Sequence, residues 1–138
     1  MKESGHCLCG AVRFEVDGAP AYLCQCHCTM CRLGVGATPV AWATFRRQGL
    51  RLLAGQPTWF QSSPEARRGF CATCGASLFF ENSKFPEEVD VTIGSLERAD
   101  DMAPTMHIWV PSRAAWARVD DGLPCHVRGP GTPAADPD

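Results

Sequence analysis

The clearest hydrophobic pattern in the chain is an alternation of apolar and polar residues near its start. In residues 11–16, Val12, Phe14 and Val16 fall on one face, as in a half-buried β-strand. Further short runs rich in β-branched and aromatic residues predict more strands. A second extended run begins at residues 22–23, and the remaining expected strands are 40–45, 50–53, 58–61, 77–81, 89–93 and 107–110.

Turn-forming residues separate these runs at regular intervals. Asp17-Gly18 is a typical hairpin turn, and glycine, proline or asparagine follows most of the later runs. Helical periodicity is weak, and the only helix expected is a short one over residues 112–118 with Ser112 as its N-cap. Many short strands with regular turns predict an all-β fold, a sandwich or a barrel-like arrangement with little helix.

The length of 138 residues is typical of one domain, and 45% hydrophobic residues are enough to form a core. The last ten residues, GPGTPAADPD, are polar and rich in turn formers, so they are expected to be disordered. The sequence therefore predicts a single folded domain over residues 1–127 and a disordered C-terminal tail over residues 128–138.

The charge pattern argues against several classes of partner. A net charge of -2 gives no basic surface for nucleic acid or anionic lipid. The sequence contains no run of about 20 apolar residues that would span a membrane, and Met1 to His6 lacks the apolar segment of a signal peptide. The expected location is the cytoplasm, where thiols stay reduced. The sequence does not indicate an oligomeric state.

Cysteine spacing carries the strongest chemical signal. Eight of the nine cysteines fall into three tight clusters, and thiols spaced by one or two residues favour zinc. A disulfide framework is the alternative, but nine is an odd number and C-x-C pairs have poor disulfide geometry. The clusters are Cys7 and Cys9; Cys24, Cys26, Cys28 and Cys31; and Cys71 and Cys74; Cys125 stands alone.

Two partitions of the clustered thiols are open. Zinc takes four protein ligands at a structural site and keeps one position open at a catalytic site. In the first partition, Cys7, Cys9, Cys71 and Cys74 close a structural site, and Cys26, Cys28 and Cys31 hold a second metal. In the second partition, Cys24 joins the second metal and closes that site as well. The four-thiolate site is the firmer inference, because each of its knuckles is followed by a glycine, Gly10 or Gly75, that suits a tight turn.

The middle cluster suggests catalysis. In an extended chain Cys24, Cys26 and Cys28 point to one face, and Cys31 returns through a turn. Three thiolates with one open position would bind an incoming thiol, and zinc would hold that thiol in its nucleophilic thiolate form.

Other candidate residues have plainer interpretations. His27 lies between two cysteines, and a supporting or surface role is favoured over metal ligation or proton donation. His107 is expected to be a hydrogen-bonded core histidine, and Cys24 and Cys125 are expected to be free thiols. Three arginines either attract carboxylates of a thiol substrate, offset thiolate charge or are simply solvated. These arginines are Arg32, Arg67 and Arg68; the large aromatics expected mainly in the core are Trp42, Trp59, Phe60 and Trp109.

Taken together, the motifs resemble the glutathione-dependent formaldehyde-activating enzyme family, whose relatives include centromere protein V. The resemblance runs from about Ser4 to Leu123. The segments that carry it are CLCGAVRF (7–14), CHCTMCR (26–32), GFCATCG (69–75), DVTIGSL (90–96), HIW (107–109) and WARVDDGLP (116–124).

The resemblance implies a compact all-β fold of several coiled sheets around zinc. It implies a structural zinc on Cys7, Cys9, Cys71 and Cys74, and a labile catalytic zinc on Cys26, Cys28 and Cys31. The activity that it implies is a carbon–sulfur lyase reaction, in which the thiolate of glutathione attacks formaldehyde to give S-(hydroxymethyl)glutathione. The alternative is a non-catalytic zinc module of the same fold that binds a protein partner or responds to thiol oxidation.

Overall fold

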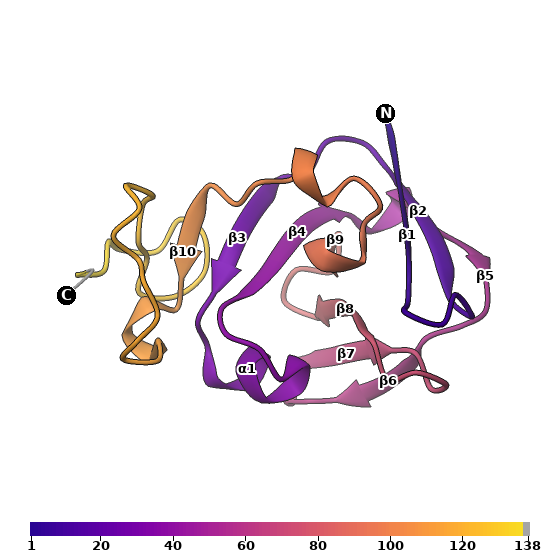
Figure 1. The fold of residues 1–138 in the computed structure, drawn as a ribbon, viewed down its shortest axis with the longest axis horizontal. Helices are drawn as coiled ribbons and strands as arrows, with labels where there is room; N and C mark the ends of the chain where they lie inside the picture. The colour runs from indigo at the N-terminus through magenta and orange to yellow at the C-terminus, as the bar shows by residue number, and fades with distance from the viewer. Residues whose placement is uncertain (137–138) are drawn as a thin grey trace.

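The structure is a computed structural model that describes residues 1–136 and folds them into two β-sheets with one α-helix (Figure 1). The strands are β1 (Lys2–His6), β2 (Arg13–Asp17), β3 (Tyr22–Cys26), β4 (Val40–Arg46), β5 (Leu50–Ala54), β6 (Thr58–Gln61), β7 (Ala66–Phe70), β8 (Ser77–Asn82), β9 (Glu88–Thr92) and β10 (Met106–Ile108). The α-helix is α1 (Thr29–Val35), and short 3₁₀ turns are η1 (Arg47–Gly49), η2 (Ile93–Ser95), η3 (Ala99–Asp101) and η4 (Val110–Ser112).

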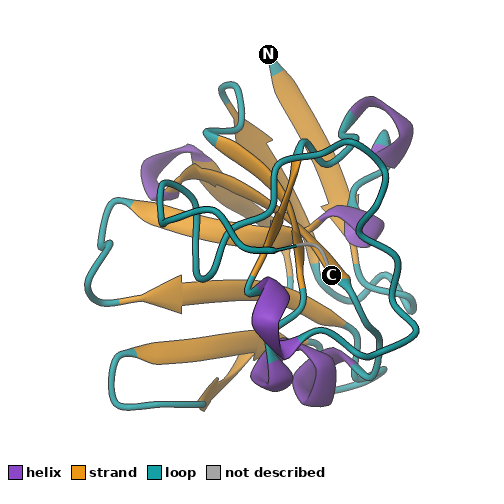
Figure 2. Cartoon of the chain, turned by 90° about the vertical axis from the view of Figure 1, so that its left-hand side faces the viewer, coloured by secondary structure: helices purple, strands orange, loops and turns teal. Residues whose placement is uncertain are grey.

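The two sheets differ in size. The smaller has the order β1-β2-β5, and the larger has the order β10-β3-β4-β9-β8-β7-β6. Neighbouring strands are antiparallel except that β10 pairs with β3 in parallel. Figure 1 shows β1, β2 and β5 at one end of the molecule and β10, with the C-terminal segment, at the other. In Figure 2, which views the molecule from the end that holds β10, loops lie in front of part of the strands.

The larger sheet has one apolar face and one chemically mixed face. Directly paired residues point to the same side of a sheet, so the register sorts the side chains. Ala43, Val91 and Phe79 form one row, and they pack with Phe14 of β2 in the core between the sheets. The ring centroids of Phe14 and Phe79 lie 4.9 Å apart in an edge-to-face contact.

The opposite face carries a row of polar and aromatic residues. Thr44 pairs with Asp90, Asp90 with Phe80, and Phe80 with Arg68. Cys24 pairs with Trp42 on the same face. This mixed face is the one that α1 covers in part, because Val35 packs against the cluster that contains Trp42. The register therefore brings chemically active side chains to one side of the sheet.

The predicted fold class is confirmed, since the described residues are mainly β-structure with one α-helix. Each predicted strand is present with small shifts at its ends. Two strands have no counterpart among the predictions. β1 (KESGH) and β7 (ARRGF) lack an alternation of apolar and polar residues, so the sequence does not mark them as strands. They form because they pair with neighbouring strands: β1 pairs with β2, and β7 pairs with β6 and β8.

The helix prediction over residues 112–118 is wrong. This segment forms turns, and Trp116 is exposed, so a helix here would have no apolar face to bury. The helix lies instead at Thr29–Val35, where Cys28 is the N-cap and Gly36 ends it in the left-handed region. The predicted strand over residues 107–110 ends at Ile108, because Trp109 adopts φ of 55°.

The C-terminal segment makes contacts up to the end of the described residues. The N–H of Ala135 donates to the carbonyl of Cys125, and the N–H of Val127 donates to that of Pro133. Part of the segment expected to be disordered therefore lies against its neighbours, and residues 137–138 of that prediction lie outside the described residues. The predicted domain boundary at residue 127 stays a prediction.

Candidate metal centres

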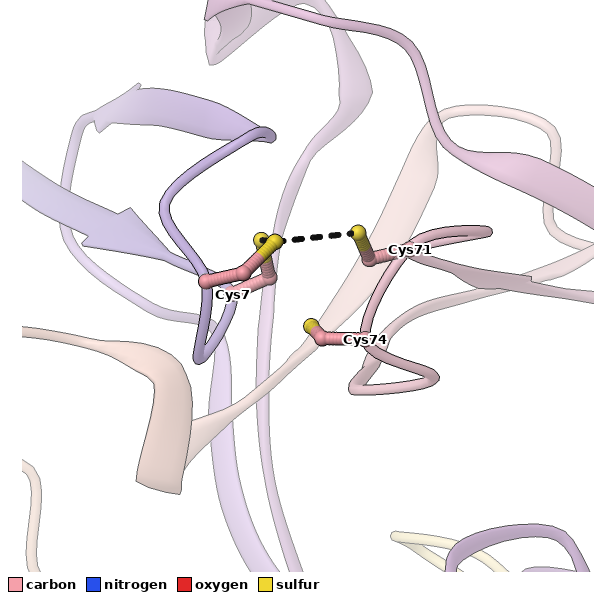
Figure 3. A group of neighbouring side chains, drawn as sticks. Cys7, Cys71 and Cys74 are labelled. Atoms are coloured by element: carbon pink, nitrogen blue, oxygen red, sulfur yellow. Dashed lines mark hydrogen bonds between the residues drawn. The ribbon is translucent and has the colours of Figure 1, made fainter.

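The first group of cysteines joins two distant loops. Cys7 and Cys9 lie between β1 and β2, and Cys71 and Cys74 lie between β7 and β8. Their four sulfur atoms lie within 4.8 Å of one another, and the labelled side chains in Figure 3 point into one shared space. We call these four residues the four-cysteine group. It connects the smaller sheet to the larger one.

The sulfur spacing in the four-cysteine group fits a tetrahedral zinc site. With Zn–S bonds of about 2.3 Å, the sulfur atoms of a regular tetrahedron lie about 3.8 Å apart. The Sγ atoms of Cys7 and Cys9 lie 3.7 Å apart, and those of Cys9 and Cys71 lie 3.8 Å apart. All four side chains are soft sulfur donors, which favours zinc over hard cations such as magnesium.

Local backbone geometry shapes the four-cysteine group. Gly10 and Gly75 have φ of 80° and 78°, which supports the tight turns expected after each knuckle. The backbone N–H of Val12 donates to Cys7 Sγ at 3.3 Å. Hydrogen bonds from the backbone N–H groups of Cys9 and Ala76 lower the pKa of Cys74 to about 6. Backbone hydrogen bonds therefore favour the thiolate at Cys74. At Cys9 a backbone hydrogen bond from Ala11 also lowers the pKa, but burial and the other cysteines of the group raise it to about 11.

A second group forms where β3 leads into α1. Cys26 is the last residue of β3, Cys28 is the N-cap of α1, and Cys31 is in its first turn. Their sulfur atoms also lie within 4.8 Å of one another. The Cys28 Sγ accepts a hydrogen bond from the N–H of Cys31 at 3.2 Å. These residues are the three-cysteine group, which supplies one ligand fewer than a closed tetrahedral site.

Thiol protons are shared unevenly within the three-cysteine group. Hydrogen bonds from the Cys26 and Cys31 side chains lower the pKa of Cys28 to about 2. The pKa of Cys26 is raised, first by its hydrogen bond with Cys28, then by its hydrogen bond with Cys31 and by burial. The metal-free group therefore concentrates negative charge on Cys28, and a divalent cation would stabilise further thiolates.

Cys24 lies outside the three-cysteine group. It is buried on the mixed face of the sheet, and burial raises its pKa to about 12, with a further contribution from Asp90. Its sulfur is not among the ligand atoms that lie within 4.8 Å of one another in the three-cysteine group. The geometry therefore favours the first of the two partitions, in which Cys24 is a free thiol.

Arg68 is the cation that contacts the three-cysteine group. Its two terminal nitrogens lie 3.5 and 3.6 Å from Cys31 Sγ, and its guanidinium stacks over Phe80 at 4.9 Å. Arg67 points to the other face of β7, where it pairs with Glu81 at 3.0 Å and covers Trp59. Of the three arginines considered from the sequence, Arg68 is therefore the one whose guanidinium hydrogen-bonds to a cysteine sulfur within the described residues.

A pocket adjoins the three-cysteine group. Its volume is about 350 Å³, within the range of small-molecule sites. Trp42 lines the pocket and also packs in the buried cluster with Cys26 and Cys31. Arg68 and Ser77 add polar side chains to the lining of the pocket, and Gly34 lines it without a side chain. Of the aromatic residues expected in the core, Trp42 is buried and Trp59 packs against the main core, whereas Phe60 and Trp109 are exposed.

The two histidines of interest are both buried. His27 and His107 are each 1% exposed, and their rings are linked by a hydrogen bond of 2.9 Å. Burial, followed by repulsion from His107, lowers the pKa of His27 to about 4. The interpretation of His107 as a hydrogen-bonded core histidine is confirmed, whereas the surface placement considered for His27 is wrong. His27 is not part of either cysteine group.

Two acidic residues near the site were not singled out from the sequence. Asp121 accepts a hydrogen bond from His107 Nε2 at 2.8 Å. Asp90 accepts one from Thr44 Oγ1 at 2.5 Å, and burial raises its pKa to about 7. The signal for Asp90 was present, because it is the polar position in the apolar run Val89-Asp90-Val91. Asp121 lies in the segment WARVDDGLP, which carries the family resemblance, but no periodicity gave this residue a role of its own.

The fold and these groups define a class: a β-protein whose sheets are joined by a four-cysteine centre and which carries a separate three-cysteine centre beside a pocket. Comparison with known proteins places it further. The family model described as glutathione-dependent formaldehyde-activating enzyme matches residues 2–112. The chain belongs to this family, as the resemblance in its motifs had indicated.

Individual relatives agree with this assignment. An uncharacterized lyase of Schizosaccharomyces pombe is 30% identical over 84 residues, which cover 59% of this chain and 61% of that protein. The chain thus matches about three fifths of the length of this curated relative. A crystal structure of a Rhodobacter sphaeroides protein superposes with a TM-score of 0.59 at 35% identity, covering 69% of this chain and 88% of the other. Among residues 1–136, no helix is long and apolar enough to cross a membrane.

Proposed function

We propose that this protein is a zinc-dependent carbon–sulfur lyase that acts on the adduct of a thiol and an aldehyde. The observation that carries the proposal is the three-cysteine group beside a pocket, with one coordination position left for a substrate. Glutathione and formaldehyde are the leading pair, because the family description names both. The lyase name of the yeast relative supports the same reaction type. We propose the cytoplasm as its location, since reduced thiols are required.

The proposed reaction is an addition that needs no redox partner. The S–H bond of the thiol breaks, a bond forms between sulfur and the aldehyde carbon, and the carbonyl oxygen becomes a hydroxyl group. The reverse reaction splits the same carbon–sulfur bond. A zinc ion held by Cys26, Cys28 and Cys31 would supply an open position and favour the ionised form of a bound thiol. The four-cysteine group would hold a structural zinc away from the reaction.

Arg68 would offset the charge of the three-cysteine group. Three thiolates and one divalent ion carry a net charge of about -1, and a substrate thiolate would add another negative charge. The guanidinium of Arg68 donates toward Cys31 Sγ and reduces that charge. Its place in the pocket wall also puts a cation within reach of an anionic substrate. The apolar wall formed by Trp42 and Phe60 would limit access of water.

The direct experiment is native mass spectrometry of the purified protein, with and without glutathione. The proposal expects two zinc ions for each chain and a glutathione adduct. It also expects S-(hydroxymethyl)glutathione to form faster in the presence of the enzyme than without it. A protein that binds two zinc ions but neither binds glutathione nor accelerates the reaction would favour the alternative, a zinc module for protein interaction or thiol redox.

A matched pair of variants tests the three-cysteine group. Cys28→Ser removes the thiolate on which the group concentrates its charge, so activity is expected to fall by at least about 100-fold while circular dichroism stays unchanged. Cys24→Ser alters a buried thiol outside the group and is expected to keep activity within about threefold. A fully active Cys28→Ser protein, or an inactive but folded Cys24→Ser protein, would contradict this assignment of ligands.

A further inference from the structure

A chain of three polar side chains crosses from the C-terminal part of the molecule to the three-cysteine group. His27 Nε2 lies 2.9 Å from His107 Nδ1, and His107 Nε2 lies 2.8 Å from a carboxylate oxygen of Asp121. Both rings are buried, whereas the side chain of Asp121 is 47% exposed. The chain thus begins at a partly exposed carboxylate and ends at the residue between Cys26 and Cys28.

Backbone hydrogen bonds hold the three segments in register. The N–H of His27 donates to the carbonyl of Ile108 at 3.0 Å, beyond the end of the parallel pairing between β3 and β10. On the other side of β10, the N–H of His107 donates to the carbonyl of Pro124 at 2.8 Å. The second oxygen of Asp121 accepts from the N–H of Leu123 at 3.2 Å. This hydrogen bond therefore orients the carboxylate independently of its contact with His107.

The acceptor at one end fixes the order of protons along the chain. A carboxylate can only accept, so His107 Nε2 must donate to Asp121. With the proton of its ring placed at Nε2, His107 accepts at Nδ1 from His27 Nε2. His27 Nδ1 is left with a lone pair, and it has no hydrogen-bond partner within residues 1–136. The ring of His27 is therefore oriented through Nε2.

We propose that Asp121, His107 and His27 form a positioning chain that holds the loop between Cys26 and Cys28, and thereby sets how firmly the three-cysteine group retains a metal. The metal part of this inference rests on the proposed function. Cys26 and Cys28 flank His27 directly in the chain, so a shift of its backbone would change the distance between their sulfur atoms. Outer residues that orient metal ligands commonly change metal affinity by about 10-fold to 100-fold when they are lost.

The proton order can be tested without any metal or activity. Long-range ¹H–¹⁵N spectra of protein labelled at histidine distinguish the two neutral tautomers and the imidazolium form. The proposal expects His27 and His107 both to carry a single proton at Nε2, in the metal-free and the zinc-loaded protein. A proton at Nδ1 of either ring, or a doubly protonated His107, would overturn the proposed order.

The positioning role is tested by zinc release to a coloured chelator. Asp121→Asn removes the obligate acceptor, and it is expected to speed release of the zinc from the three-cysteine group by about tenfold. Release from the four-cysteine group serves as an internal reference and should not change. Asp120→Asn is the matched control, because Asp120 is the adjacent exposed carboxylate and pairs with Arg118 instead. This variant should release both ions at the wild-type rates.

The outcomes separate this inference from the proposed function. Wild-type release kinetics in a folded Asp121→Asn protein would overturn the positioning role. Faster release from both groups would also overturn it, since that result indicates general destabilisation. A wild-type protein that retains two zinc ions but does not catalyse the reaction would contradict the proposed function and leave the positioning role supported by the tautomers and the release rates.

Discussion

At the residue scale, the two arginines of β7 illustrate how one position in a strand decides a role. Arg67 and Arg68 are adjacent in sequence but point to opposite faces of the sheet. Arg67 pairs with Glu81 and covers Trp59, whereas Arg68 contacts Cys31 and lines the pocket. The sequence alone gives both residues the same interpretation, because β7 lacks the alternation that would assign its faces.

Arg68 is expected to contribute to thiol binding. Replacing it by methionine keeps most of the side-chain length but removes the charge-assisted hydrogen bonds to Cys31 Sγ, so the KM for the thiol is expected to rise by about tenfold. Arg67→Met is the control, and it should lower thermal stability slightly and leave the KM unchanged. Steady-state kinetics with the thiol varied at fixed aldehyde would check both, and equal KM values in all three proteins would contradict the role of Arg68.

Asp90 makes stability depend on pH. Its pKa is raised from 3.8 to about 7 by burial, so the folded state keeps a proton that the unfolded chain has already lost. This contribution to stability is complete below about pH 3.8 and is lost as the pH rises through about 7. Because Asp90 keeps some exposure to solvent, we expect the wild type to lose about 1 kcal/mol relative to Asp90→Asn between about pH 5.5 and about pH 8.

Urea unfolding of the zinc-loaded proteins at several pH values would measure this difference. The lower limit of about pH 5.5 is chosen to keep thiolates metal-bound, since acid releases zinc from cysteine. Parallel curves for the wild type and Asp90→Asn would show that Asp90 stays ionised in the folded protein.

At the scale of elements, β1 shows how packing overrides a weak local pattern. Its sequence predicts no strand, yet it pairs along its length with β2. Gly5 is needed there, because the ring of Phe14 lies against its Cα and leaves no room for a side chain. The local sequence signal for α1 is also weak, because a cysteine serves as its N-cap in place of the usual serine, threonine or aspartate.

Gly5→Ala is expected to destabilise the smaller sheet. The added Cβ would lie 2.3 Å from an atom of the Phe14 ring and 2.8 Å from the carbonyl oxygen of Ser95. Overpacking of this kind costs about 1–3 kcal/mol, and the free energy of unfolding from urea titration should fall by that amount. Gly94→Ala is the matched control, since no atom lies within 4 Å of its added Cβ. Equal stability of the two variants would contradict this packing.

Most of the β-strands could be predicted from sequence, because they bury one apolar face and punctuating residues mark their ends. The cysteine clusters could also be found, since their short spacings are visible along the chain. The pocket, the contact of Arg68 with Cys31 and the link from His27 to Asp121 could not. Each depends on strand register between segments that are far apart in sequence, which local patterns do not encode.

At the scale of the whole molecule, the four-cysteine group connects the two sheets. Cys7 follows β1 of the smaller sheet and Cys71 follows β7 of the larger sheet, and both are buried against the main core. A metal that binds the assembled site and not the unfolded chain would stabilise the packing between the sheets. The three-cysteine group lies within one short segment, from the end of β3 into α1, and contributes less to the overall architecture.

Loss of the four-cysteine group should therefore unfold the protein more readily than loss of the three-cysteine group. Cys71→Ser is expected to lower the melting temperature by about 10 °C or more, because it should cost several kcal/mol and each kcal/mol lowers the melting temperature of a domain of this size by about 3–5 °C. Cys28→Ser should lower it by only a few degrees, and Cys125→Ser, which alters a thiol outside both groups, should change it little. Differential scanning calorimetry would rank the three, and the reverse order for Cys71 and Cys28 would contradict this division of roles.

The positions of the two groups along the chain also set an order of assembly during synthesis. A ribosome that has released residue 74 has supplied every ligand of the four-cysteine group. The hydrogen-bond chain to His27 needs His107, which is 80 residues further along, and then Asp121, another 14 residues on. At a synthesis rate of about 5–20 residues per second, Asp121 is added to the chain several seconds after His27. A nascent chain could thus hold both complete sets of cysteine ligands, and begin to fold around them, well before the hydrogen-bond chain that orients His27 is complete.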